Sequence, residues 1–94
     1  MKELEILIIG KHPDIMKTIL RLLNNKPGWT GSGVFTAEEA ITLSQNKVLD
    51  IVLLGAGLSE GESDQIKSHF TVPVVQHYGG GSGLLYAEVY ENIK

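Results

Sequence analysis

Two short apolar stretches, LEILII at residues 4–9 and DIVLL at residues 50–54, decide the fold that this sequence predicts. Both are rich in branched side chains, and each is followed directly by a glycine, Gly10 or Gly55. An apolar run of this length is typical of a β-strand that is buried on both faces, as in a parallel sheet. The two stretches therefore predict two central strands with helices packed on either side.

Helical patterns separate these strands from two weaker ones. Three of the predicted helices begin with a residue suited to a first turn or a cap, namely Pro13, Thr36 and Ser59. Strands that alternate with helices imply βαβ units and a parallel sheet covered on both faces. We therefore predict a single α/β domain over residues 1–94. Its order is strand 4–9, helix 13–23, strand 29–35, helix 36–46, strand 50–54, helix 59–70, strand 72–75 and helix 84–93.

Composition excludes several classes of function. The chain has 8 basic and 11 acidic residues and a net charge of −3, which argues against a nucleic-acid-binding face. It has no cysteine, so disulfides, cysteine metal sites and thiol catalysis are excluded. No apolar run is long enough for a membrane span. We expect a protein of the cytoplasm that binds neither nucleic acid nor a membrane.

Four segments resemble the receiver domains of bacterial response regulators. The segment LIIGKHP at residues 7–13 is similar to the end of the family's first strand, and TAEEA at residues 36–40 to the start of its second helix. The segments DIVLL at 50–54 and VPVV at 72–75 are similar to its third and fourth strands. The resemblance implies a flavodoxin-like (CheY-like) open parallel sheet of about four strands in the order 2-1-3-4, and a role in two-component signalling.

The residues that carry receiver chemistry are replaced. By the resemblance, the acidic pair that holds Mg²⁺ falls at Gly10 and Lys11, and the phospho-acceptor aspartate falls at Gly55. Glycine offers no ligand and no nucleophile, and Lys11 brings a positive charge to the ion's place. The family's hydroxyl residue falls near His77 or Tyr78, and its later Lys-Pro pair has no counterpart. The resemblance thus implies a pseudo-receiver, one strand–helix unit short, that is not an enzyme and needs no cofactor.

A second candidate function is the binding of a small ligand at the carboxyl ends of the strands, where open α/β sheets bind ligands. The candidate pocket residues are His12, His77, Gly79 and Gly80, and the ligand classes are a nucleotide, an anion or a corrinoid. Asp14 together with the two histidines matches no local metal motif, so no metal site is predicted.

The last helix carries the candidate interface. Leu85, Val89 and Ile93 form one apolar stripe, and Tyr86 and Tyr90 form a second that adjoins it. One stripe must cover the sheet, whereas the tyrosine stripe is either buried as well or faces a partner. Without a fifth strand, the fourth leaves an open sheet edge. We therefore expect a protein partner or a second copy of the chain, in a two-fold homodimer.

Overall fold

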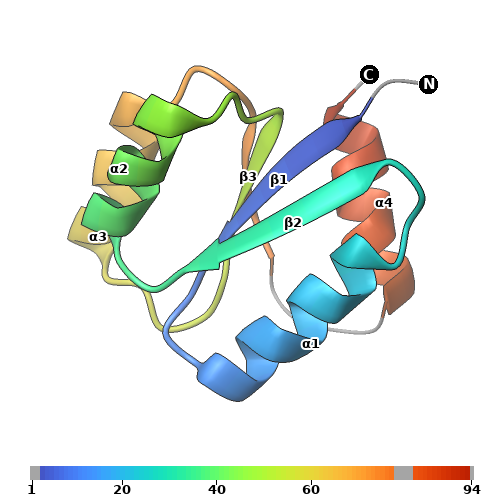
Figure 1. The fold of residues 1–94 in the computed structure, drawn as a ribbon. Coiled ribbons are helices and arrows are strands. Elements are labelled where there is room, and N and C mark those ends of the chain that lie inside the picture. The colour runs from blue at the N-terminus through green and yellow to red at the C-terminus, as the bar shows by residue number, and fades with distance from the viewer. Residues whose placement is uncertain (1–2, 78–81, 94) are drawn as a thin grey trace.

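The computed structural model describes residues 3–77 and 82–93 of the chain. Strands and helices alternate along it in the predicted order (Figure 1). No helix among the described residues is both long enough and apolar enough to span a membrane. The elements are β1 (Leu4–Ile9), α1 (Pro13–Asn24), β2 (Trp29–Val34), α2 (Ala37–Asn46), β3 (Ile51–Leu54), α3 (Glu60–His69), β4 (Val74–Gln76) and α4 (Ser82–Asn92).

The four strands form one parallel sheet in the order β2-β1-β3-β4. β1 pairs with β2 on one side and with β3 on the other, and its Ile8 lies opposite Leu53 of β3. The chain leaves β1 toward β2, then returns over β1 to β3, so the direction of winding reverses between β1 and β3. This order confirms the predicted flavodoxin-like (CheY-like) sheet.

Helices cover both faces of the sheet, as predicted. Ile6 and Ile8 of β1 face the layer formed by α1 and α4, whereas Leu7 and Ile9 face the layer formed by α2 and α3. Successive side chains of a strand point to opposite faces, so a strand between two helical layers needs an apolar residue at every position. This explains why the apolar run of residues 6–9 is continuous.

Two glycines in β2 let α1 lie close to the sheet. A Cβ atom on Gly33 would lie 2.5 Å from Sδ of Met16, and one on Gly31 would lie 3.0 Å from Cβ of Leu23. Both neighbours belong to α1. β2 is an edge strand, as predicted, and these glycines make room for the helix that covers it.

The fourth strand differs from the prediction. It spans Val74–Gln76 rather than residues 72–75. Pro73 lacks an N–H group and so cannot donate to the ladder, although its carbonyl accepts a hydrogen bond of 2.9 Å from the Val52 amide. Strand pairing therefore begins one residue after the proline.

Substitution of two valines that are close in the sequence measures how much the cores on the two faces of the sheet contribute to stability. Val52 of β3 is fully buried at 0% exposure, whereas Val48 is 85% exposed. We expect Val52→Ala to lower the free energy of unfolding by about 2–3 kcal/mol, from lost burial and the cavity left behind. Val48→Ala, the matched control, should change it by less than about 0.5 kcal/mol. Urea unfolding measures both, and equal losses would contradict this picture of the core.

Candidate functional site

The ends of β1 and β3 meet at the carboxyl edge of the sheet, where their backbones are in close contact. The Gly55 amide donates a hydrogen bond of 2.6 Å to the Ile9 carbonyl. A Cβ atom on Gly55 would lie 3.0 Å from that carbonyl oxygen and 3.4 Å from Cα of Gly10. The first distance is shorter than an ordinary contact, so a side chain at Gly55 would require the end of β1 to move by a few tenths of an ångström.

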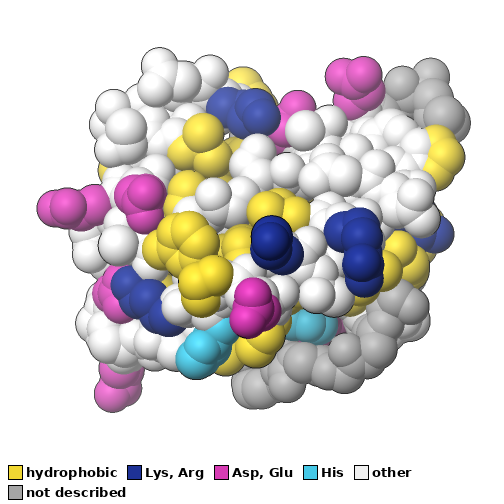
Figure 2. All heavy atoms as spheres, turned by 60° about the horizontal axis from the view of Figure 1, so that its bottom comes forward, with side chains coloured by type: hydrophobic (Ala, Val, Ile, Leu, Met, Phe, Trp, Pro, Cys, Tyr) yellow, Lys and Arg dark blue, Asp and Glu magenta, His cyan; other side chains and the backbone are white. Residues whose placement is uncertain are grey.

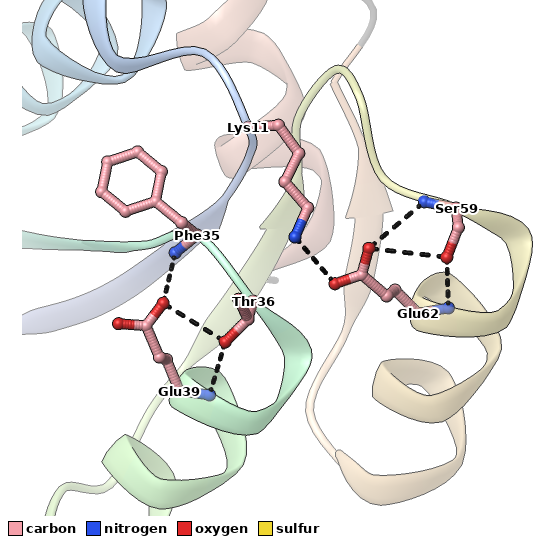
Figure 3. Close-up of polar contacts among 6 residues, drawn as sticks. All are labelled: Lys11, Phe35, Thr36, Glu39, Ser59 and Glu62. Atoms are coloured by element: carbon pink, nitrogen blue, oxygen red, sulfur yellow. Dashed lines mark hydrogen bonds and ion pairs between the residues drawn. The ribbon is translucent and has the colours of Figure 1, made fainter.

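Lys11 lies across the loop that follows β3. Its amide donates to the Ala56 carbonyl at 3.1 Å, and its Nζ lies 2.9 Å from Oε2 of Glu62 in α3. Its aliphatic stem packs on Gly57, where an added Cβ would lie 2.8 Å from Cβ of Lys11. Gly57 also has a φ of 89°, a conformation that favours glycine. Figure 3 shows the Lys11 side chain reaching from the end of β1 to α3.

Glu62 binds Lys11 and at the same time caps its own helix. Its Oε1 accepts hydrogen bonds from the amide and the hydroxyl of Ser59, and the Ser59 hydroxyl accepts one of 3.2 Å from the Glu62 amide. This is a capping box, which holds the first turn of α3 in place. The capping box at the start of α3 therefore holds the Glu62 carboxylate in the position where it pairs with Lys11.

The electrostatics of the pair favour the charged form of Glu62. The hydrogen bond from the Lys11 ammonium holds the pKa of this carboxyl below its ordinary value, and backbone amides of Ser59 and Ala37 lower it further. Burial opposes these effects only in part, since the Glu62 side chain is 26% exposed and that of Lys11 is 32% exposed. The pair is thus a partly shielded ion pair at the centre of this edge.

Charges of both signs cover the surface at this edge. Figure 2 brings the lower side of Figure 1 forward and shows basic, acidic, histidine and hydrophobic side chains intermixed, with no continuous patch of one charge. Within residues 3–77 and 82–93, no three His, Asp or Glu side chains are grouped so that they could hold a metal ion. The donor set that Mg²⁺ requires, several oxygen ligands, is not assembled there.

The candidate ligand pocket is only partly described. His12 lines a hollow of about 10 Å³ together with Gly10, Gly55 and Met16, which has room for a single water molecule at most. His77 does not line it. Gly79 and Gly80 lie outside the described residues, so their part in a pocket stays a prediction.

His77 takes part in a buried contact with the last helix. Its ring is 6% exposed, and its Nδ1 pairs with Oε1 of Glu88 in α4. Its amide donates to the Leu54 carbonyl at 2.9 Å. This histidine therefore ties α4 to the ends of β3 and β4, a role that the sequence did not suggest.

The predicted interface residues of α4 divide into buried and exposed ones. Leu85 and Val89 are 1% and 0% exposed and lie in the core; their assignment to an interface is wrong, because their stripe covers the sheet. Ile93 is partly buried against the same core. The Tyr86 hydroxyl donates to the Leu22 carbonyl at 2.9 Å, and Tyr90 is 47% exposed. The tyrosine stripe is thus half-buried, and only Tyr90 is widely open to solvent.

Sequence reasoning missed Glu62 and Glu88, the two acidic partners of the site. The spacing Ser59-x-x-Glu62 matches a capping box, which was a signal for Glu62 as a fixed carboxylate. Its ion pair with Lys11 joins residues 51 positions apart, and no local pattern in the sequence marks such a contact.

Comparison with known proteins gives a clear answer for the fold. No protein-family model matches the chain, and no curated protein matches it. Solved structures do match. A fusion of a yeast Spc42 trimeric coiled coil to another structure has a TM-score of 0.79 and 22% identity, and covers 99% of this chain and 80% of the other.

Two further matches are described as receiver domains. The CheY-like response regulator receiver domain from Methylobacillus flagellatus has a TM-score of 0.72 and 12% identity, and the match covers 99% of this chain and 100% of the other. The signal receiver domain of an HD domain-containing protein from Pseudomonas fluorescens Pf-5 has a TM-score of 0.69 and 18% identity, with 99% and 71% covered. The chain therefore has the receiver fold, which confirms the resemblance at the level of structure.

The ion pair at the centre of the site predicts a pH-dependent stability. Glu62→Gln keeps a side chain that can complete the capping box but removes the charge that Lys11 meets. Because the folded pKa of Glu62 is lowered, its stabilisation is fully present above the ordinary value of 4.5 and is lost as the pH falls below it. We expect Glu62→Gln to lower the Tm at pH 7, and the difference from the native chain to shrink below pH 4.5.

Glu60→Gln is the matched control, since Glu60 lies in the same first turn of α3 and is exposed. Both substitutions remove a negative charge near the positive end of the helix dipole. Only Glu62→Gln should also lose the contact with Lys11. Equal Tm losses for the two variants across pH 3–7, measured by thermal unfolding, would contradict a stabilising ion pair.

Proposed function

We propose that the chain is a receiver-like signalling domain of the response-regulator type that does not accept a phosphoryl group and acts through protein–protein contacts. The observation that carries this proposal is the Lys11–Glu62 ion pair, 2.9 Å between Nζ and Oε2. Lys11 directly follows Gly10, which contacts Gly55, and the resemblance puts the family's acidic site at these three residues. The receiver fold of the chain supports the same proposal.

Phosphoryl transfer to a receiver requires a carboxylate nucleophile, a metal ion and positively charged groups around the phosphoryl oxygens. Gly55 has no nucleophile, and its Cα lies against the end of β1. Lys11 is already paired, and Glu62 is held by the capping box of α3. In this proposal the Lys11 ammonium group neutralises the Glu62 carboxylate. The loops at the carboxyl edge of the sheet therefore keep one conformation without phosphorylation.

A thermal-shift experiment tests the loss of phosphoryl chemistry. A ligand that binds only the folded chain raises the Tm. We expect Mg²⁺ with beryllofluoride, which mimics a phosphoryl group on a carboxylate, to leave the Tm of the native chain unchanged. A rise that requires both components would show that the chain has a working acceptor and would overturn this part of the proposal.

The double variant Gly10→Asp/Lys11→Asp is the matched control. A Cβ on Gly10 would meet its nearest neighbours at 3.7–3.8 Å, which is ordinary contact. The variant restores the two carboxylates of the family's metal pair and frees Glu62 from its partner. We expect Mg²⁺ alone to raise the Tm of this variant but not that of the native chain.

The open edge of β4 supports self-association. Pro73 and His77 bond to β3, so the alternation of the ladder turns the N–H and C=O groups of Val74 and Gln76 to the outer side. Within the part of the chain that the structure describes, these outer groups have no backbone partner. Two copies related by a two-fold axis would pair their β4 edges antiparallel and continue the sheet. We propose this homodimer as one interaction of the domain.

A pair of variants at one position tests the edge. Gln76→Ala and Gln76→Pro both remove the side-chain hydrogen bond to the Leu54 carbonyl, but only proline also removes the outer N–H. Proline is tolerated on edge strands. We expect the native chain and Gln76→Ala to dimerise at high micromolar concentration in sedimentation or light scattering, and Gln76→Pro to be monomeric. A monomeric native chain at these concentrations would overturn the dimer.

The alternative function, a small-ligand module, rests on His12, His77, Gly79 and Gly80, and the two glycines lie outside the described residues. Within the described part, the hollow beside His12 is too small for a nucleotide or a corrinoid. The same thermal-shift experiment distinguishes the two functions, because a nucleotide or cobalamin that raises the Tm would favour the ligand-binding role.

A further inference from the structure

Three aromatic rings surround a lysine at the amino edge of the sheet, the end opposite Gly10 and Gly55. Trp29 begins β2, and Tyr86 and Tyr90 lie one turn apart on α4. The Trp29 ring meets Tyr86 edge-on, with centroids 5.8 Å apart, and lies 5.3 Å from Tyr90. The Nζ atom of Lys26 lies 4.4 Å from the centroid of Tyr86, 5.5 Å from Tyr90 and 5.9 Å from Trp29.

We propose that Trp29, Tyr86 and Tyr90 form a binding site for an organic ammonium group, and that Lys26 occupies this site in the ligand-free chain. We call the three rings the aromatic cage. The site is independent of the proposed function, because it lies at the other edge of the sheet and shares no residue with the Lys11–Glu62 pair.

The arrangement of the rings is suited to a cation. The face of an aromatic ring is electron-rich and attracts an ammonium group within about 6 Å of its centroid. All three centroids satisfy this distance for Lys26. Methylated ammonium groups are recognised by such cages because they keep the charge but are weakly hydrated. The net charge of −3 on the chain also favours a cationic ligand.

Among the described residues, the contacts of the Lys26 ammonium group are with the aromatic rings. Within residues 3–77 and 82–93 the ion pairs are made by Lys11, Lys47 and His77, and no carboxylate pairs with Lys26. Its backbone is fixed separately, since its amide donates to the Leu23 carbonyl at 3.3 Å and its carbonyl accepts from the Trp29 amide at 3.1 Å. The side chain can therefore leave the cage without loss of the turn.

The cage is also accessible. Tyr90 is 47% exposed, and Lys26, Trp29 and Tyr86 are half-buried. A ligand would enter from the solvent side of Tyr90 and displace the Lys26 ammonium. Because Lys26 is tethered beside the cage, it competes with any ligand and lowers the apparent affinity of the native chain. Removing the lysine should therefore reveal the site.

Trp29 is the only tryptophan of the chain, so its fluorescence reports on the cage directly. We would titrate the native chain and Lys26→Ala with choline chloride at constant ionic strength, and with 3,3-dimethyl-1-butanol, the neutral carbon isostere of choline. We expect choline to change the fluorescence of both proteins, with an apparent Kd about 2- to 5-fold lower for Lys26→Ala, the range of one exposed cation–π contact. The neutral isostere should have no effect.

A second variant and a second cationic ligand test whether the response comes from the aromatic cage. Tyr90→Leu in the Lys26→Ala background should abolish the response, while thermal unfolding checks that each variant is folded. N-acetyl-trimethyllysine amide, titrated beside choline, distinguishes a modified side chain of a protein from a free small molecule as the source of the ammonium group. No response of folded Lys26→Ala to either cation, or an equal response to the neutral isostere, would overturn the proposal.

Discussion

The burial of β1 on both faces is the constraint on which the other elements depend. Its residues 6–9 are at most 1% exposed, and they alternate between the α1–α4 layer and the α2–α3 layer. Both helical layers pack against side chains of β1. A strand that is buried on both faces in this way lies inside the sheet, with a neighbouring strand on each side. β2 and β3 supply those neighbours, and the crossing connections then assign each helix to its face.

The same constraint brings Gly10 and Gly55 together. β1 and β3 are adjacent and parallel, so their carboxyl ends emerge at one edge, and the residues that follow them meet. In an open α/β sheet this point of reversal is where ligands bind. Here the backbones are in close contact, and Lys11 forms an ion pair with Glu62. The place where open α/β sheets bind ligands is therefore occupied here by a contact between two glycines and by an ion pair.

The fold could be predicted from the sequence because its signals are local. The apolar runs of β1 and β3, and the caps Thr36 and Ser59, each lie within a few residues of the element they define. β4 was misplaced by about two residues because Pro73 contributes a carbonyl but no N–H to the ladder. The glycines of β2 could not be explained from the sequence, because they are required by the close packing of α1 on this strand.

The candidate site was less predictable because its contacts are distant in the sequence. Lys11 was expected to place a charge at the edge, and it does, but its partner Glu62 lies in α3, 51 residues later. His77 was expected in a pocket, yet it faces Glu88 of α4. A pattern of residue types can indicate which side chains end a strand. It cannot indicate which helix end will meet them, since this depends on the packing of the whole layer.

The position of α4 explains why polar and aromatic contacts gather around it. α4 lies on the same face of the sheet as α1 and covers it with Leu85 and Val89. Leu85 and Val89 are the side chains of α4 that are buried in this core, so burial against the sheet involves one stripe of the helix. The contact of Glu88 with His77 holds one side of α4, and the Tyr86 hydroxyl bonds to the end of α1. Two of the three rings around Lys26, Tyr86 and Tyr90, therefore lie on a helix that is bonded both to α1 and to the residue after β4. The third, Trp29, lies on β2, and a binding site built on packed helices and strands holds its geometry better than one built on loops.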